Sequence, residues 1–471
     1  MALAAFLGTL ALILGVGLLS ALRSRGTRQD YYVASSGVAP SLVGLSAVAT
    51  NNSGYMFIGV IGYTYATGLA AAWLMIGWIV GDLIASLLIH HKLRVQTEAL
   101  DEATFGGILS RWYGQDFRIY RRVAALVSII FLGAYTAAQL TAGGKALQAL
   151  LGWHPSAGAW VGAAMVIAYC LAGGIRASIW TDAAQSAVMM IAMAILAWVA
   201  IAELGGIGAT MSAFEAIPGF LSMAAPPDAW PGVSGLALFV IGWLFAGFSV
   251  VGQPHIMVRF MALDTPGNLW RARLWYYGFF ILFYAAATLV GMLSRLYLPD
   301  LGAGDPELAL PSMAQALLPS FLVGIVLAGI FAATISTADS LVLSCSSAIT
   351  QDLPSRQIEN KWMLKAATAM VVAFALAIAL FQVQSVFSLV ILAWSVLASA
   401  FAPLMLVYAR GGRPGEAQAL AMMAVGVGVA LAWRGLDWHN AVYEGMPGML
   451  AGWLVHVAWQ RRKPEAVVAP D

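Results

Sequence analysis

The sequence predicts an all-α membrane protein with about thirteen transmembrane helices. Of the 471 residues, 61% are hydrophobic and only 10% are charged, whereas a soluble domain has about 25% charged residues. No globular core could bury so much apolar surface, so the excess is expected to face lipid. Apolar runs long enough to cross a bilayer recur at short intervals, and the basic residues between them are strongly biased to one side.

The apolar runs define the expected spans. They cover residues 2–22, 39–65, 68–91, 123–151, 157–180, 181–204, 234–258, 273–298, 320–350, 363–383, 385–409, 416–434 and 442–460. The first run has the length of a signal peptide, but its basic residues, Arg23, Arg25 and Arg28, follow it instead of preceding it. This order favours an uncleaved helix with its N-terminus outside.

The basic residues orient the remaining spans. With the N-terminus outside, all 24 Lys and Arg residues fall on the inner side except Lys145, Arg295 and Arg434. An even number of spans would mix the two sides, so thirteen spans with a cytoplasmic C-terminus, in the inner membrane of a bacterial-type cell, is the self-consistent topology. The inner segment 92–122 is expected to contain a short amphipathic helix near 103–113.

Composition also argues against several function classes. The net charge of +2 gives no sign of a nucleic-acid partner, and no obligate protein partner is evident. Cys170 and Cys345 lie in apolar runs and are expected to pack rather than to form a disulfide or metal site. There is no Walker-type loop for ATP. The His, Asp and Ser residues lack the spacing of a zinc site or a catalytic cluster, so an enzyme is not expected.

The first polar stretch inside an expected span covers residues 49–54. A charged side chain at the bilayer centre costs at least about 2.5–3.5 kcal/mol, so polar residues inside a span indicate function by default. Here Thr50, Asn51, Asn52 and Ser53 interrupt an apolar helix and favour non-helical backbone. Discontinuous helices of this kind hold ions and solutes in many secondary transporters. A helix–helix contact through Asn and Ser side chains is the structural alternative.

A second polar stretch runs through the ninth span. Ala333, Ser336, Thr337 and Ser340 recur at helical spacing and form one stripe, with Asp339 beside it. Hydroxyls and a carboxylate are hard oxygen ligands, which suit a hard cation better than a transition metal. Hydrogen bonds from Ser and Thr to their own helix are the alternative, although this alternative does not account for the acid.

Two more acids lie in apolar surroundings. Asp182, near the start of the sixth span, either caps a helix N-terminus or contributes to a site, and its sequence context leaves both readings open. Asp82 in the third span is isolated, and the sequence names no partner for it.

Several motifs occur in the order of one known family. They are Leu45-Ser46-Ala47 with Ser53-Gly54, Lys92 through Glu98, Gly173-Gly174 with Trp180-Thr181-Asp182, Gly252-Gln253-Pro254-His255 with Arg259 through Ala262, and Ser336-Thr337 with Cys345 through Leu353. Through these motifs, the sequence resembles the sodium:solute symporter family and is most similar to its bacterial sodium/proline symporters. The likeness spans about residues 40–410.

The resemblance implies the leucine-transporter fold, in which two inverted five-helix repeats each begin with a broken helix. The implied organisation is an extra N-terminal helix with an inner loop (1–38), the first repeat (39–204), an outer loop (205–233), the second repeat (234–409) and two C-terminal helices with a short inner tail (410–471). The activity implied is sodium-coupled symport, with sodium as the co-transported ion and a small organic solute as the other partner.

The resemblance also implies binding residues. One sodium ion would be held by the carbonyls of Ala49, Asn52 and Ala333 and the hydroxyls of Ser336 and Thr337. A second sodium ion, found in some relatives, would use Asp182, Ser336, Asp339 and Ser340. The solute would lie near Asn51, Ser53, Gly54, Tyr55, Tyr135, Trp243, Phe248 and Gln253. Free N–H groups at broken helices favour a carboxylate, so an amino acid such as proline is the natural cargo.

Two departures from the proline carriers are visible. Asn51 stands where they have an aspartate, and Asp339 stands where they have a serine, so the negative charge is expected to have moved across the cavity. Ala246 and Val250 stand at aromatic substrate positions of the proline carriers. Another small carboxylate of the pantothenate type is therefore an alternative cargo. A transport-like sensor is the alternative from another class, but the chain ends soon after its last span and shows no output domain.

Overall fold

The computed structural model describes residues 1–22, 27–226, 229–381 and 385–462. The α-helices are α1 (Ala2–Ala21), α2 (Arg28–Val33), α3 (Pro40–Asn51), α4 (Ile61–Thr67), α5 (Ala72–Ala85), α6 (His91–Leu100), α7 (Phe105–Arg111), α8 (Arg118–Leu151), α9 (Pro155–Glu203), α10 (Ile207–Glu215), α11 (Gly232–Phe248), α12 (Pro254–Met261), α13 (Leu269–Tyr297), α14 (Ala309–Leu317), α15 (Ser320–Ser347), α16 (Lys361–Phe381), α17 (Val386–Ala409), α18 (Glu416–Gly435) and α19 (Gly445–Arg462). The predicted amphipathic helix is α7. Arg23, Arg25 and the inner tail beyond 462 lie outside the described residues.

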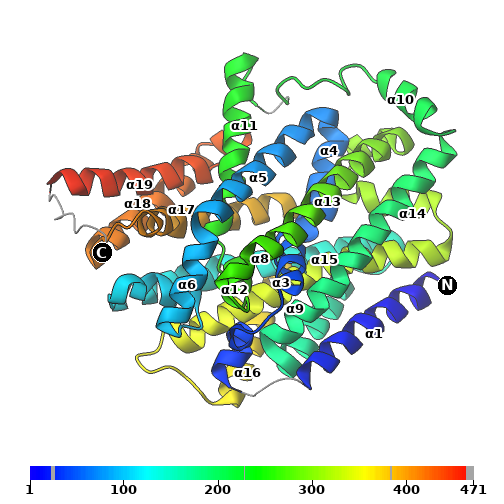
Figure 1. Ribbon diagram of the computed structural model, residues 1–471. Coiled ribbons are helices and arrows are strands. Elements are labelled where there is room, and N and C mark those ends of the chain that lie inside the picture. The colour runs from blue at the N-terminus through cyan, green and yellow to red at the C-terminus, as the bar shows by residue number, and fades with distance from the viewer. Residues whose placement is uncertain (23–26, 227–228, 382–384, 463–471) are drawn as a thin grey trace.

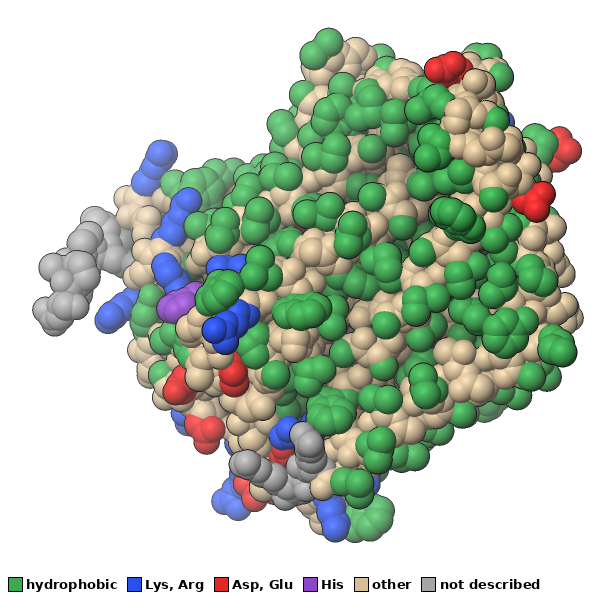
Figure 2. Space-filling view, turned by 45° about the vertical axis from the view of Figure 1, so that its right-hand side comes forward, with side chains coloured by type: hydrophobic (Ala, Val, Ile, Leu, Met, Phe, Trp, Pro, Cys, Tyr) green, Lys and Arg blue, Asp and Glu red, His purple; other side chains and the backbone are tan. Residues whose placement is uncertain are grey.

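Among the described residues, ten helices are long and apolar enough to cross a membrane. The chain is thus a multi-pass membrane protein. Thirteen spans remain a prediction because the run 39–65 is broken, the run 157–180 holds a shorter apolar helix (156–168), and α19 is not among the ten. Hydrophobic side chains cover the middle of the surface in Figure 2, and Lys and Arg gather at its lower left.

Two helices are broken in the middle of the bundle, as predicted. The helix α3 ends at Asn51, and Asn52 has φ −83° and ψ 40° before a π-helical turn at Tyr55–Val60 leads into α4. The helix α11 ends in a 3-10 turn at Ser249–Gly252, and α12 begins after Gln253, whose backbone is extended. The Pro254 ring lacks an N–H to continue a helix from α11, which places the second break locally.

One predicted boundary is wrong. The spans expected at 157–180 and 181–204 are two helices that α9 joins across a kink, and the kink lies at Gly174, where φ is 56° and ψ is −145°, instead of at residue 180. Glycine adopts this conformation without strain, and a Cβ here would lie 2.6 Å from the carbonyl oxygen of Tyr31. Asp182 therefore lies inside a helix, so its reading as a helix cap is also wrong.

The broken helix α3 lies inside the bundle, where α9, α12, α13 and α15 pack against it. The helix α15 is buried along almost its whole length, and α8, α9 and α3 all contact it. On another side, α5 and α11 touch backbone to backbone, because Gly81 and Gly247 face each other's helices without side chains. The start of α1 and the end of α19 lie on opposite sides of the molecule (Figure 1).

Candidate functional site

Oxygen atoms from α3 and α15 converge where α3 breaks. The Ser336 hydroxyl lies 3.3 Å from the carbonyl oxygen of Ala49 and 3.1 Å from that of Ala333. The Thr337 hydroxyl donates to the carbonyl of Thr50 at 2.9 Å. Ser336 therefore makes the hydrogen bond to its own helix that was the structural alternative, but Thr337 bonds across to α3.

The residues around this point are fully buried. Ala49, Asn52, Ala333, Ser336 and Thr337 each have a relative exposure of 0%. Asn52 is the first residue after α3, and both polar atoms of its side chain lack a partner among the described residues. Hydrogen bonds thus join Ser336 to Ala49 and Ala333 at the break, Thr337 bonds to Thr50 beside them, and Asn52 directly follows α3; a set of oxygen atoms suits a hard cation.

The predicted second sodium site contains a basic side chain that the sequence did not place there. Arg259 of α12 lies 3.4 Å from Asp182 and 4.0 Å from Asp339, and all three side chains have an exposure of 0%. Its guanidinium also donates to the hydroxyls of Ser178 and Ser340. The positive-inside pattern counted Arg259 with the inner segments, and the structure buries its side chain and pairs its charge with two acids.

Hydroxyl donors complete this cluster. Asp182 accepts hydrogen bonds from Ser46 at 2.6 Å and from Thr50 at 3.4 Å, whereas Asp339 accepts from Ser178 and Ser340, each at 2.9 Å. One oxygen of each carboxylate remains without a partner among the described residues. Two carboxylates and one guanidinium leave the cluster with one excess negative charge, counting both acids as ionised.

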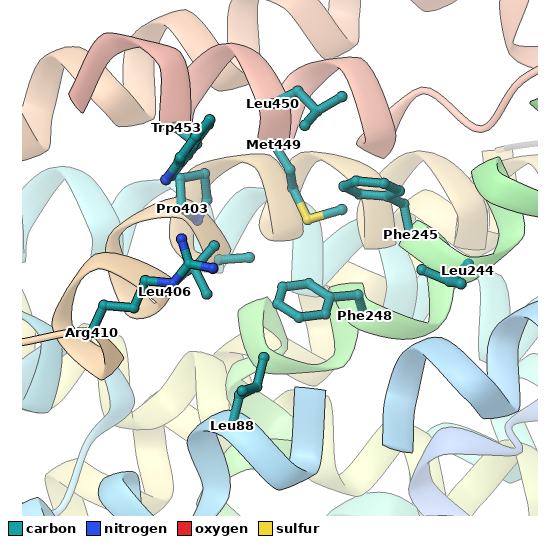
Figure 3. Close-up of a pocket in the computed structure, with 11 residues that line it drawn as sticks. Leu88, Leu244, Phe245, Phe248, Pro403, Leu406, Arg410, Met449, Leu450 and Trp453 are labelled. Atoms are coloured by element: carbon teal, nitrogen blue, oxygen red, sulfur yellow. The ribbon is translucent and has the colours of Figure 1, made fainter. Parts of the chain in front are cut away.

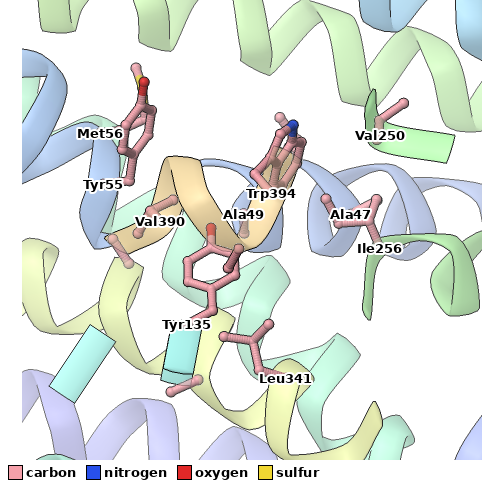
Figure 4. Packing of buried hydrophobic residues seen from close by; sticks show 14 of the residues in the cluster. Ala47, Ala49, Tyr55, Met56, Tyr135, Val250, Ile256, Leu341, Val390 and Trp394 are labelled. Carbon is pink, nitrogen blue, oxygen red and sulfur yellow. The ribbon is translucent and has the colours of Figure 1, made fainter. Parts of the chain in front are cut away.

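Several buried polar atoms beside the break have no hydrogen-bond partner within the part of the chain that the structure describes. They are Tyr55 Oη, Trp78 Nε1, Gln139 Nε2, Gln253 Oε1 and both ring nitrogens of His255. Such atoms are rare in folded proteins and call for an explanation. Ring contacts connect them, because His255 packs against Tyr135 and Trp394, and Trp394 packs against Trp78. Figure 4 shows Tyr55, Tyr135 and Trp394 near Ala49.

Most of the predicted solute residues belong to this region. Tyr135 donates to the Ser53 hydroxyl at 3.1 Å, and the backbone N–H of Gly54 donates to Gln139 at 2.8 Å. Gln253 donates to the carbonyl of Trp394 at 2.9 Å. These hydrogen bonds hold the two breaks against α8 and α17. Gly54 has no room for a side chain, because a Cβ would lie 2.7 Å from Thr334.

Aromatic rings lie beside the polar atoms. Tyr55 packs 5.7 Å from Trp78, which stacks on Trp243 at 5.9 Å and lies 5.2 Å from Trp394. Tyr55 and Trp243 were predicted from the sequence, whereas Trp78 and Trp394 were not. Both tryptophans lie in ordinary apolar runs, so only their meeting in space distinguishes them from other packing residues.

Phe248 is not part of this region. It lines a separate groove of about 300 Å³ with Leu88, Arg410, Met449 and Trp453, between α11, α17 and α19 (Figure 3). Five residues separate Phe248 from Trp243, which places the two side chains about 140° apart around a helix. The prediction of Phe248 as a solute contact is therefore not supported.

Ion pairs link the elements at both ends of the candidate site. Lys145 of α8 contacts Asp305 at 2.7 Å and Glu307 at 2.6 Å, and Glu307 also accepts hydrogen bonds from Ser385 and from the first backbone N–H groups of α17. At the other end, Arg121 contacts Asp352 at 2.7 Å. These contacts tie α8 to loops and helices that enclose the break.

Comparisons with known proteins agree with this architecture. The sialic acid symporter solved in a substrate-bound, outward-open state matches with a TM-score of 0.82 at 19% identity, covering 100% of this chain and 98% of that one. The hydantoin-bound transporter Mhp1 matches with a TM-score of 0.60 at 14% identity, covering 92% and 94%. MhsT, solved with L-phenylalanine, matches with a TM-score of 0.55 at 15% identity, covering 89% and 96%. The leucine-transporter-like fold is thereby confirmed.

Sequence relatives are found at higher identity. The osmoregulated proline transporter OpuE of Bacillus subtilis is 31% identical over 92% of this chain and 90% of its own length. The sodium/proline symporter of Escherichia coli is 30% identical over 93% and 89%. The profile of the sodium:solute symporter family matches residues 31–426. The predicted resemblance and the absence of an enzymatic function are confirmed, and the chain belongs to the sodium:solute symporter family.

Proposed function

We propose that this family member couples the inward movement of sodium to the uptake of a small zwitterionic solute, with an amino acid such as proline as the first candidate. The observation that carries the proposal is the gathering of unpartnered buried polar atoms beside the break in α3. A bound solute with a carboxylate and an ammonium group would satisfy donors and acceptors that otherwise remain unpaired.

For sodium, we propose the position between α3 and α15. The ligands are the carbonyls of Ala49, Asn52 and Ala333 and the hydroxyls of Ser336 and Thr337. The Ser336 hydroxyl already lies within hydrogen-bond distance of two of these carbonyls, those of Ala49 and Ala333. A cation here would bind the broken end of α3 to α15 through oxygens of both, so sodium binding and the shape of the break depend on each other.

A second sodium ion is proposed only in competition with Arg259. The predicted ligands Asp182, Ser336, Asp339 and Ser340 surround or adjoin the guanidinium, which contacts both acids and Ser340. A sodium ion and a guanidinium at one point would repel each other in a low-dielectric interior. We infer that the second sodium ion enters only when the Arg259 side chain moves away from the acids.

For the solute, support comes from the aromatic and polar residues at the two breaks. Two relatives with overall identities of about 30% carry proline, and the tyrosine hydroxyl of Tyr135 lies against Ser53 at the first break. The rings of Trp78, Trp243 and Trp394 provide π-faces for the ammonium end of a zwitterion.

The energetics suit accumulation of a neutral solute. A tenfold sodium gradient provides about 1.4 kcal/mol, and a potential of 100 mV adds about 2.3 kcal/mol for each charge. One sodium ion per solute molecule would then support an accumulation of roughly 500-fold. The test is uptake of a radiolabelled panel of amino acids and small carboxylates into proteoliposomes, with and without an inward sodium gradient. Equal uptake with choline in place of sodium would contradict the proposal.

A further inference from the structure

Asp82 lies on α5, inside the bundle and close to the break in α3. Its exposure is 0%, and its carboxylate accepts three hydrogen bonds from two other helices. Tyr276 donates to Oδ2 at 2.7 Å, and Tyr277 donates to Oδ1 at 2.7 Å. The Asn51 amide donates to Oδ2 at 3.2 Å and to the Tyr276 hydroxyl at 2.6 Å. Asp82 thus connects α5 with the last residue of α3 and with α13.

The surroundings of Asp82 carry no compensating charge. Among the described residues, no Lys, Arg or His lies within 4.0 Å of its carboxylate. Arg273, one turn before Tyr277 on α13, uses its guanidinium to bind Ser86. His90, two turns after Asp82, stacks on Phe260. A buried carboxylate without a cation is costly, and neutral donors offset only part of that cost.

The atoms around Asp82 are suited to accept a cation. All three donors point at the carboxylate, which is the arrangement that stabilises its charged form. Asn51 is 2% exposed, and its side-chain oxygen has no partner among the described residues. The Asn51 amide now turns its Nδ2 toward Asp82, and rotation of the amide by half a turn would bring its oxygen to both Asp82 oxygens and the two tyrosine hydroxyls, which are hard ligands from three helices.

We propose that Asp82, Asn51, Tyr276 and Tyr277 form a further sodium site. It shares no side chain with the cluster of Asp182, Asp339 and Arg259 or with the sodium site at Ser336 and Thr337. Sodium here would neutralise the only carboxylate that contacts Asn51 among the described residues, and it would fix the end of α3 against α5 and α13. The inference rests on the proposed sodium coupling and adds one ion to it.

A site for a proton fits the hydrogen bonds less well. A protonated Asp82 would carry a donor of its own among three donors already directed at it, so at least one of these hydrogen bonds would be lost or reversed. A purely structural role would explain the hydrogen bonds, but it leaves the Asn51 oxygen and the negative charge without a partner.

The test is equilibrium binding of radioactive sodium to purified protein in lipid nanodiscs, without solute. Asp82→Asn removes the charge and keeps the shape, so it should bind one sodium ion fewer per protein than the wild type. Tyr277→Phe removes one oxygen and keeps the acid, and it should weaken that binding step by about three- to tenfold. Tyr297→Phe is the matched control, because its hydroxyl donates to the carbonyl of Ala200, away from Asp82.

Different outcomes separate the alternatives. The wild-type number of sodium ions and wild-type affinity in both Asp82→Asn and Tyr277→Phe would overturn the proposal. An unchanged number together with a lost pH dependence would assign a proton instead, and this also overturns it. If Asp82→Asn does not fold, normal sodium binding by folded Tyr277→Phe decides against the site. Failure of the wild type to bind any sodium would contradict the proposed function itself, which is a distinct result.

Discussion

The hydroxyl of Thr337 donates to the carbonyl of Thr50 across 2.9 Å, from the middle of α15 to the penultimate residue of α3. Thr50 also donates to Asp182 at 3.4 Å. One residue at the end of the broken helix therefore joins the candidate sodium ligands on α15 to the buried acid on α9. A substitution at the sodium ligands on α15 should therefore alter the hydrogen bonding of Asp182, and a substitution at Asp182 should alter sodium binding.

Replacing Thr337 with Ala should raise the sodium concentration needed for half-maximal uptake at least tenfold, or about 1.4 kcal/mol. The variant loses an ion ligand, whereas alanine suits a helix better than threonine does. Uptake measured against sodium concentration tests this. Ser347→Ala is the control, since this hydroxyl donates only to the carbonyl of Ser344 on its own helix. Wild-type sodium dependence in Thr337→Ala would leave the hydroxyl with a structural role only.

Replacing Arg259 with Gln should lower thermal stability and make it strongly dependent on sodium. Removing one partner of a buried ion pair typically costs about 3–5 kcal/mol, and here it leaves two acids without the positive charge that a sodium ion can restore. Thermal unfolding is measured in sodium chloride and in choline chloride at equal ionic strength. A loss of stability that sodium does not restore would argue against competition between Arg259 and sodium for Asp182 and Asp339.

Replacing Glu307 with Ala should destabilise the protein by about 1–3 kcal/mol, because the N–H groups at the start of α17 and the ammonium of Lys145 lose a charged partner. Asp305→Asn is the matched control, since it leaves the Glu307 contacts in place. Denaturation of the purified variants provides the measurement. Stability of Glu307→Ala equal to that of the wild type would show that the Glu307 bridge contributes little to the fold.

Replacing Gly81 with Ala should abolish transport and reduce the yield of folded protein. The new Cβ would lie 1.8 Å from the carbonyl oxygen of Leu244, so α5 and α11 would have to separate. Gly278→Ala on α13 should behave like the wild type, because a Cβ there meets no atom within 4 Å. Size-exclusion profiles and uptake are compared for the two variants. Full activity of Gly81→Ala would contradict the close contact.

Local chemistry explains what the sequence predicted well. Asn52, Ser53 and Gly54 are poor helix residues inside an apolar run, so the first break could be predicted from neighbouring residues alone. The second break was implied by the family resemblance, and Pro254, which lacks an N–H, accounts for its position. The recurrence of Ser336, Thr337 and Ser340 on one face is likewise a property of a single helix. These signals mark the two polar stretches without any knowledge of the packing, whereas the sodium ligands on them were implied by the family resemblance.

Contacts between distant residues explain what was missed. Asp82 meets Tyr276 across 194 positions, and Arg259 meets Asp182 across 77. The positive-inside rule treats each arginine as part of a water-exposed segment. It cannot account for partners such as those of Arg259, which lie on other helices. The expected exchange of charge between Asn51 and Asp339 illustrates the same limit. Asn51 contacts Asp82 instead, so changes at Asn51 and Asp339 should have additive effects on sodium affinity.

The glycine contact between α5 and α11 has a mechanical consequence. With no side chains between their backbones at Gly81 and Gly247, the two helices cannot roll or slide past each other without a steric clash. When the solute site opens, α5 and α11 should therefore rotate together as one rigid body relative to α15 and its neighbours. Spin labels on α5 and α11 would then keep a constant separation through the transport cycle, while the separation between either label and one on α15 would change.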